Sequence, residues 1–305
     1  MQNYIDLLKD VVENGVDKPD RTGVGSRAVF GRMLRWDLAQ GYPLQTTRKV
    51  PLRIAFEETM FFLRGETNTK LLEEKNINIW KGNTTREFLD KRGLYYLPVG
   101  DMGKGYGYQW RHWETTETNT QWSWASEDYY TSYKAGKEVD QIADLLKGLK
   151  DDPYGRRHIV TGWNPGQLHE MALPPCHMLH MYSVEGDFTV HEGKLNNCFV
   201  MRSNDVPFGL PFNIASYALI NHIFAKHLGL IPGELVYFGW DVHIYQNQMK
   251  MVEEILERKP RPLPQIVIHK DLPKFEDILA LQWEDIELIG YNHHPDVKNK
   301  PEMAV

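Results

Sequence analysis

The order of strand-like and helix-like segments constrains this fold more than any other feature of the sequence. Four segments that look like strands follow one another before a long apolar segment with helical spacing, at residues 212–229. The four are residues 157–163, 176–183, 187–191 and 195–202. A doubly wound sheet would alternate strands and helices regularly instead. The order therefore predicts an α+β fold, with a mixed multi-stranded sheet packed with helices.

Other elements surround this block without any stretch that looks like a linker. The chain has no low-complexity segment and no internal repeat, so we predict a single domain over residues 1–305. Apolar residues at helical spacing predict helices, and stretches rich in β-branched and aromatic residues predict strands. Further helices are expected at residues 2–14, 51–64, 137–150 and 245–257, and further strands at residues 27–38, 234–240 and 264–269.

Residues 112–136 have a different character. They are polar and aromatic and show no helical period, as in Trp113-Glu-Thr-Thr-Glu-Thr-Asn-Thr-Gln-Trp122. Long irregular segments are uncommon in compact domains and are often functional, although a surface insertion fits the pattern equally well. We predict an irregular insertion here.

The charge and the cysteine count exclude several classes of protein. Lys+Arg number 35 against 41 Asp+Glu, a net charge of −6, which argues against coating DNA but allows a basic pocket for one small anion. Two cysteines exclude a disulfide scaffold and favour a reducing compartment. The first residues do not resemble a signal peptide, and no segment approaches the ~20 apolar residues of a membrane span. We expect a cytoplasmic protein with no membrane partner and no obligatory nucleic-acid partner.

The two cysteines, Cys176 and Cys198, do not look alike. Cys176 follows two prolines and opens an apolar strand, whereas Cys198 lies inside a strand pattern. A buried structural thiol is the commoner role for a lone cysteine. A reactive thiol needs a nearby cation, and spacing alone does not bring an arginine to either residue. Both interpretations of Cys176 stay open at this point.

Two adjacent carboxylates interrupt the apolar helix expected at residues 51–64. Glu57 and Glu58 lie in its middle. Adjacent positions on a helix point about 100° apart, so at least one carboxylate should face the apolar side.

Four arginines stand in short polar contexts that would suit a phosphate group. They are Arg21, Arg156, Arg157 and Arg202. Guanidinium groups bind phosphate oxygens well, but most arginines are solvated surface residues, so each alone is weak evidence. No metal site is predicted, because His177 and His180 have no accompanying set of ligands.

Eight short blocks, in the same order along the chain, resemble those of thymidylate synthases. They are Asp20–Gly25, Pro43–Thr47, Phe62–Asn68, Tyr106–Arg111, Met171–His177, Gly209–Tyr217, Asp241–Tyr245 and Met303–Val305. Ordered agreement of this extent is highly specific. The chain is therefore identified as a member of the family that contains thymidylate synthases and deoxypyrimidine-nucleotide hydroxymethylases, which implies a thymidylate synthase-like α+β fold.

The resemblance implies a covalent mechanism. Cys176 matches the nucleophile that adds to C6 of a pyrimidine nucleotide. Glu58, Tyr106 and His177 match the network that moves protons. Asp205 is a further candidate in this group, together with His177 and His180, for activating a water molecule.

The nucleotide-binding residues follow from the same blocks. Arg21, Arg202 and Ser203 resemble phosphate ligands, and Arg156 and Arg157 match a pair that reaches the same phosphate across a homodimer interface.

The sugar and the base have their own matching residues. His243 and Tyr245 resemble ligands of the deoxyribose. Asn213 matches the asparagine that contacts the amide face of uracil, where cytosine-specific relatives carry aspartate. The implied nucleotide is dUMP.

The second ligand implied is a folate. Trp80, Asp205, Gly209 and Val305 match positions that hold 5,10-methylenetetrahydrofolate, the co-substrate, and close the site. No metal is implied.

Departures from the synthase pattern favour a different product. Met201–Gly209 is similar to the phage deoxycytidylate hydroxymethylases, Trp240 replaces a glycine and His180 replaces an apolar residue. We therefore expect a dUMP hydroxymethylase that captures an exocyclic methylene with water, and a phage source. The alternatives are a thymidylate synthase making dTMP and dihydrofolate, and a non-catalytic nucleotide- or RNA-binding relative.

Overall fold

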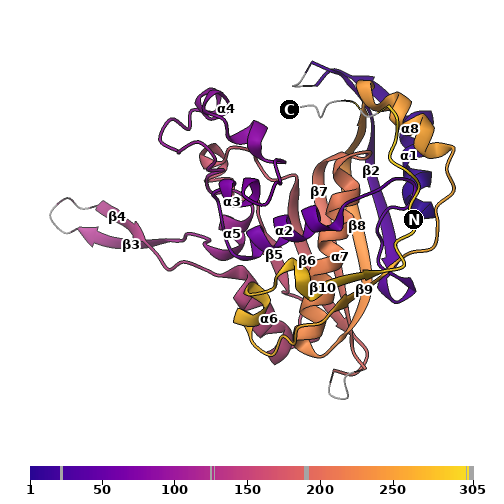
Figure 1. Ribbon diagram of the computed structural model, residues 1–305. Helices are drawn as coiled ribbons and strands as arrows, with labels where there is room; N and C mark the ends of the chain where they lie inside the picture. The colour runs from indigo at the N-terminus through magenta and orange to yellow at the C-terminus, as the bar shows by residue number, and fades with distance from the viewer. Residues whose placement is uncertain (21–22, 124–125, 127, 189–191, 300, 302–305) are drawn as a thin grey trace.

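A six-stranded mixed sheet forms the centre of the protein (Figure 1). The computed structural model describes residues 1–20, 23–123, 126, 128–188, 192–299 and 301. The strand order is β1-β2-β8-β7-β6-β5, and all neighbours are antiparallel except β7 and β8, which are parallel. The strands are β1 (Val16–Lys18), β2 (Ser26–Asp37), β5 (Ile159–Thr161), β6 (His177–Glu185), β7 (Lys194–Asp205) and β8 (Ile231–Tyr245). The predicted α+β class is confirmed.

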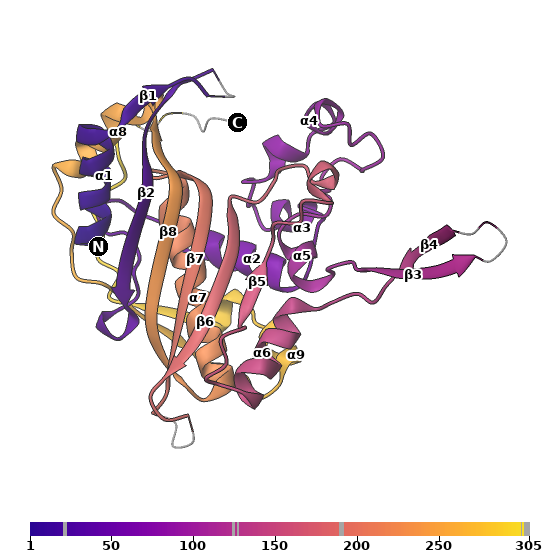
Figure 2. The same cartoon turned by 180° about the vertical axis from the view of Figure 1, so that it is seen from behind.

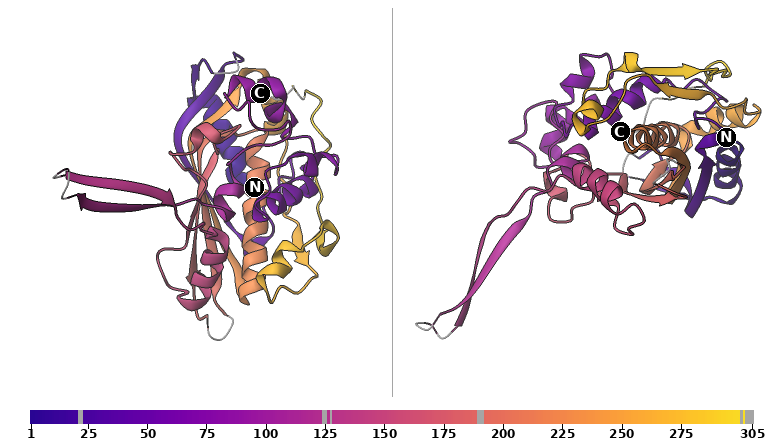
Figure 3. Two further views of the ribbon diagram at one scale, coloured as in Figure 1. Left: turned by 90° about the vertical axis from the view of Figure 1, so that its left-hand side faces the viewer. Right: turned by 90° about the horizontal axis from the view of Figure 1, so that it is seen from below.

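Helices cover one face of this sheet and leave the other face bare (Figures 2 and 3). The central helix is α7 (Gly209–Leu228), whose apolar residues surround it on all sides, so it is buried between the sheet and α2 (Leu52–Leu63). It ends at Gly229, where φ of 69° suits a residue without a side chain. The other helices are α1 (Gln2–Asn14), α3 (Lys70–Glu73), α4 (Arg86–Lys91), α5 (Gly107–Arg111), α6 (Gln141–Asp151), α8 (Met249–Leu256) and α9 (Phe275–Leu279).

Most predicted elements are present, with shifts at their ends. The helix expected from residue 137 begins at 141, because the Asp140 side chain caps it by accepting a hydrogen bond from the Ala143 N–H. The helix expected from 245 begins at 249, since β8 continues to Tyr245. The strand at 264–269 is β9 (Gln265–Ile268), which pairs with β10 (Ile286–Ile289). The strand expected at 187–191 lies largely outside the described residues.

The prediction of an irregular segment at 112–136 was wrong. The chain forms a regular hairpin of β3 (Thr116–Ser123) and β4 (Asp128–Ala135), which projects well away from the body (Figure 3). Both strands contain threonine and aromatic residues, which have high strand propensity. Cross-strand contacts support the pairing, such as the Thr120 and Thr131 hydroxyls at 2.9 Å. That the hairpin is an insertion stays a prediction.

The sheet topology brings residues that are distant in the sequence together at one end of the central strands. Because β7 and β8 are parallel, their carboxyl ends lie side by side. The antiparallel strand β6 begins at the same end of the sheet. The register pairs His177 with Met201, Ser203 with Asp241, and Asp205 with His243. Residues near positions 176, 203 and 243 therefore meet although the chain separates them widely. No helix in the described part of the chain is both long and apolar enough to cross a membrane.

Candidate active site

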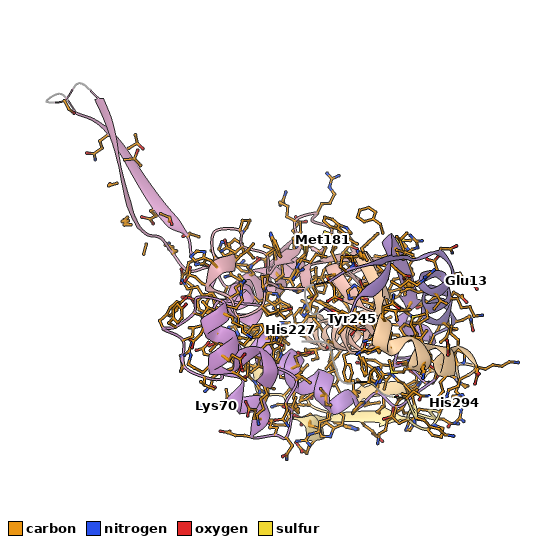
Figure 4. All side chains as sticks on the ribbon, turned by 90° about the horizontal axis from the view of Figure 1, so that it is seen from above. Glu13, Lys70, Met181, His227, Tyr245 and His294 are labelled. Atoms are coloured by element: carbon orange, nitrogen blue, oxygen red, sulfur yellow. The ribbon has the colours of Figure 1, made fainter. Side chains whose placement is uncertain are left out.

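A cleft of about 610 Å³ opens at the carboxyl ends of β7 and β8, between these strand ends, α2 and α7. This volume lies within the range of small-molecule sites. Twelve of the predicted site residues line it: Glu58, Trp80, Tyr106, Cys176, His177, Arg202, Ser203, Asp205, Gly209, Asn213, His243 and Tyr245. Figure 4 labels Tyr245, at the end of β8 and far from the hairpin.

Four other predicted residues are not among those lining the cleft. Arg156 and Arg157 are exposed, and Arg157 pairs with Asp152 at 3.4 Å. Arg21 and Val305 lie outside the described residues. The described part of one chain therefore brings only Arg202, of the four candidate arginines, to the cleft.

Cys176 has the cationic neighbour that spacing alone did not reveal. Nη2 of Arg202 lies 3.8 Å from its Sγ. Arg202 also donates to the carbonyls of Pro174 and Pro175, at 2.8 and 2.9 Å, and lies over the ring of Trp163. A cation held in this way stabilises negative charge on the sulfur. The interpretation of Cys176 as a reactive thiol is the better supported one.

Cys198 is in a different environment. It lies in β7, does not line the cleft, and burial raises the pKa of its thiol. A thiol with a raised pKa is a poor nucleophile at neutral pH, so Cys198 fits a structural role.

Tyr106 contacts Cys176, the candidate nucleophile, directly. Its hydroxyl accepts a hydrogen bond from the backbone N–H of Cys176 at 2.9 Å. Its ring stacks on Phe62, with centroids 5.0 Å apart, and tilts against His177. Burial raises the pKa of Tyr106 well above its ordinary value, so the phenol stays protonated at neutral pH.

Glu58 is the titratable carboxyl of the cleft. Burial raises its pKa to about 7, although its carboxylate accepts a hydrogen bond from the Trp80 indole at 2.9 Å. Both protonation forms are therefore available near neutral pH, as acid–base catalysis requires. Both carboxylates of this helix point inward, since Glu57 is buried against Lys75 at 2.6 Å.

The two candidate histidines differ in position. Nδ1 of His177 lies 2.8 Å from the hydroxyl of Tyr217, and burial lowers the pKa of His177 to about 3, so the ring is neutral. His180 is fully buried behind the site, hydrogen-bonded to Tyr182, and does not line the cleft. His180 is therefore not placed to activate a water in the cleft.

A charged group that sequence reasoning missed supports His243. Asp241 accepts from Lys18 at 2.5 Å and lies 3.0 Å from Nδ1 of His243. The hydrogen bond from His243, and then the one from Lys18, lower the pKa of Asp241 to about 2. Strand alternation offered a signal, because Asp241, His243 and Tyr245 follow at intervals of two and share one side of β8.

Asp205 lies next to His243, its partner in the β7–β8 register. Its carboxylate accepts hydrogen bonds from the Phe208 N–H at 3.1 Å and from the Gln248 side chain at 3.0 Å. Burial raises its pKa, and these bonds oppose that shift. The cleft is also lined by Ile79, Trp80, Phe208 and Phe212, which supply an apolar and aromatic surface suited to a flat heterocyclic ligand.

This arrangement defines a class of enzyme site. A thiol held beside a cation, with a carboxyl group poised between its two forms and an aromatic wall, suits covalent catalysis on a small polar ligand. Among the described residues, no three His, Cys, Asp or Glu side chains are grouped to hold a metal ion.

Comparison with known proteins identifies the family. The family model described as thymidylate synthase matches residues 2–305. A bifunctional dihydrofolate reductase-thymidylate synthase of Paramecium tetraurelia is 42% identical over 302 residues, which cover 99% of this chain and 61% of the relative. One of Zea mays is 39% identical over 302 residues, covering 99% and 54%. The chain belongs to the thymidylate synthase family, and it spans roughly half to three fifths of these relatives.

The expectation of a dUMP hydroxymethylase was wrong. The relatives are named as thymidylate synthases, which supports the alternative. Two of the departures that suggested it, Trp240 and His180, do not line the cleft, whereas Met201 of the Met201–Gly209 block does line it. The phage source, which rested on that expectation, has no support.

Proposed function

We propose that this chain converts dUMP to dTMP with 5,10-methylenetetrahydrofolate, releasing dihydrofolate. The observation that carries the proposal is the geometry around Cys176, with Arg202 at 3.8 Å and Glu58 in the same cleft. Membership of the thymidylate synthase family, which uses methylenetetrahydrofolate as co-substrate, supports it.

The polar side of the cleft fits a nucleotide. The described contacts of Arg202 use its Nε and Nη2 groups, so its Nη1 group can bind a phosphate. Ser203 adds a hydroxyl donor. His243, oriented by Asp241, and Tyr245 lie on the same strand and suit the hydroxyl group of a sugar. The aromatic wall containing Trp80 is left for the folate.

The chemistry assigns each residue a task. The Cys176 thiolate adds to C6 of the uracil, and the electron pair moves to C5, which becomes a carbon nucleophile. C5 attacks the methylene carbon of methylenetetrahydrofolate. Loss of the C5 proton then expels tetrahydrofolate from that carbon, and tetrahydrofolate returns a hydride to the exocyclic methylene, which gives the methyl group and dihydrofolate. Glu58, as carboxylate, accepts the proton that C5 must lose, and protonated Tyr106 donates hydrogen bonds within the site. Departure of the sulfur restores the C5–C6 double bond.

The product distinguishes this proposal from its alternatives. With dUMP and methylenetetrahydrofolate, we expect one dTMP and one dihydrofolate per turnover, measured by the absorbance of dihydrofolate and the mass of the nucleotide. A reaction without dUMP serves as the control and should yield no dihydrofolate. Hydroxymethyl-dUMP without dihydrofolate, or no turnover at all, would contradict the proposal.

Asn213 is proposed to select the base. A side-chain amide offers both an acceptor for N3–H and a donor for O4 of uracil, whereas a carboxylate suits the amino group of cytosine. We expect Asn213→Asp to shift the ratio of kcat/KM from dUMP toward dCMP by at least about tenfold. Asn213→Ala is the matched control and should lose dUMP activity without gaining dCMP activity. Unchanged discrimination in the aspartate variant would refute this role.

We propose that the working unit is a homodimer in which Arg156 and Arg157 reach the partner's phosphate site. Dimers are typical of the family. Both arginines are exposed and absent from their own cleft. The sheet strands β2 and β8 carry exposed apolar side chains, including Phe30, Phe238 and Trp240, which a second copy would cover. Four further expectations stay predictions: no metal, no membrane partner, no obligatory nucleic-acid partner, and a cytoplasmic location.

A further inference from the structure

Tyr106 has a backbone conformation that needs external support. Its φ of 43° and ψ of −104° lie in a region that residues with side chains rarely adopt. Such conformations persist only where the surrounding structure enforces them. After Tyr106, the chain is held by Gly107, which touches the backbone of Phe62 so closely that a Cβ would lie 2.6 Å from its carbonyl oxygen. The support before Tyr106 comes from a different set of contacts.

Two segments run side by side before they reach the catalytic pair. Gly103 forms an isolated antiparallel bridge with Met171, and Lys104 N–H donates to the carbonyl of Glu170 at 3.2 Å. From this bridge, one segment leads to Tyr106 and the other to Cys176. They meet again where the Cys176 N–H donates to the Tyr106 hydroxyl at 2.9 Å. The two catalytic residues thus close a loop whose base is at Lys104.

A lysine joins the two segments at this base. Nζ of Lys104 lies 2.9 Å from a carboxylate oxygen of Glu170 and 2.9 Å from one of Glu114, which lies two residues before the hairpin. Glu114 also accepts from the Tyr108 hydroxyl at 2.6 Å, and the carbonyl of Lys104 accepts from Gln109 at 2.8 Å. Lys104, Glu114 and Glu170 are called the Lys104 clamp below. Their side chains are only partly exposed, at 27%, 42% and 26%.

We propose that Lys104 is a positioning residue: by joining Glu170 and Glu114, it holds the turn before Tyr106 in the strained conformation that puts the Tyr106 hydroxyl on Cys176. The role rests on the proposed function. It acts through Tyr106 alone, because Lys104 does not line the cleft and touches no atom of the nucleotide site. Loosening the clamp therefore changes how often the catalytic pair is correctly formed, and leaves nucleotide binding intact.

Three variants test this role. Lys104→Met keeps the length of the side chain and removes the charge. Because partly exposed ion pairs are individually weak, we expect kcat to fall about three- to tenfold, with KM for dUMP unchanged. Lys104→Arg, which can still reach both carboxylates, should retain kcat. Lys134→Met removes an exposed ion pair of the hairpin, Lys134 with Glu117 at 2.7 Å, and should leave kcat unchanged.

A second readout does not depend on turnover. Hydrogen exchange at the Cys176 amide, followed by mass spectrometry, should be faster in Lys104→Met than in the other two variants, because that amide donates to Tyr106. In the wild-type protein, raising salt from about 0.05 to 1 M should lower kcat at saturating substrate, since salt screens the clamp. This measurement stands even if the methionine variant does not fold.

The outcomes separate the clamp from the proposed function. An inactive wild-type protein would refute the proposed function, whereas faster exchange at the Cys176 amide in Lys104→Met would still support the clamp. A wild-type protein that makes dTMP, with Lys104→Met within twofold of it in kcat, would overturn the clamp. A loss of kcat with unchanged exchange at Cys176 would overturn it too, because the lysine would then act elsewhere.

Discussion

Replacing Cys176 with serine is expected to lower kcat by at least about 10⁴-fold, because removal of a catalytic nucleophile commonly costs this much or more. A serine hydroxyl stays protonated at neutral pH, and Arg202, which lies 3.8 Å from Sγ, stabilises an anion but accepts no proton. Formation of dihydrofolate measures the loss. Binding of dUMP, measured by calorimetry, should change little, since the polar side of the cleft is untouched.

The second cysteine supplies the matched control. Cys198→Ser should retain kcat, because Cys198 lies in β7 outside the cleft. If Cys176→Ser kept more than about a tenth of the wild-type rate, the covalent mechanism would be wrong.

The same variant tests the shared site. Cys176→Ser is co-expressed with a copy carrying Arg156→Ala and Arg157→Ala. Random pairing of a symmetric dimer makes half of the dimers mixed, and one site in each mixed dimer receives both an intact cysteine and intact arginines. About a quarter of the wild-type activity should therefore return. No recovery in a mixture shown to contain mixed dimers would refute the donation of arginines across the interface.

Replacing Glu58 with glutamine is expected to lower kcat by about 10²- to 10⁴-fold, the usual contribution of a positioned proton carrier. The pKa of Glu58 is raised to about 7 by burial. If the carboxylate accepts the C5 proton, kcat/KM of the wild-type protein should rise between pH 6 and pH 8. The glutamine variant should lose this rise. A pH profile that keeps its shape in the variant would assign the proton to another group.

Stability gives an independent measure of the same pKa. The folded-state pKa of about 7 exceeds the ordinary value of 4.5, so ionisation disfavours the folded state once pH rises above 4.5, and fully above 7. Glu58→Gln removes this penalty, and its Tm should exceed that of the wild-type protein more at pH 8 than at pH 5. Glu57→Gln is the neighbouring control: it loses the 2.6 Å pair with Lys75 and should show no such gain. Equal Tm differences at both pH values would contradict the raised pKa of Glu58.

Local sequence blocks identified most of the candidate site. Each block is a short stretch, such as Asp241–Tyr245, whose residue types and spacing are sufficient to match a family. The α+β class likewise followed from the order of segments. The hairpin at 116–135 was missed because β3 alternates threonine with polar residues and β4 shows no alternation, so neither strand separates an apolar from a polar face as a half-buried strand would.

What the sequence by itself determined was the family and the residue types available for catalysis, because these depend on which residues occur and in what order. Only the tertiary structure decided what surrounds each of them. The pairing of β6 with β7 brings Arg202 to Cys176 across 26 residues, and burial beside Trp80 moves the pKa of Glu58 to about 7. The same packing keeps His180 and Trp240 out of the cleft, while the comparison with known relatives overturned the expected product. Strand register and burial arise between segments far apart in the chain, so no local pattern reports them.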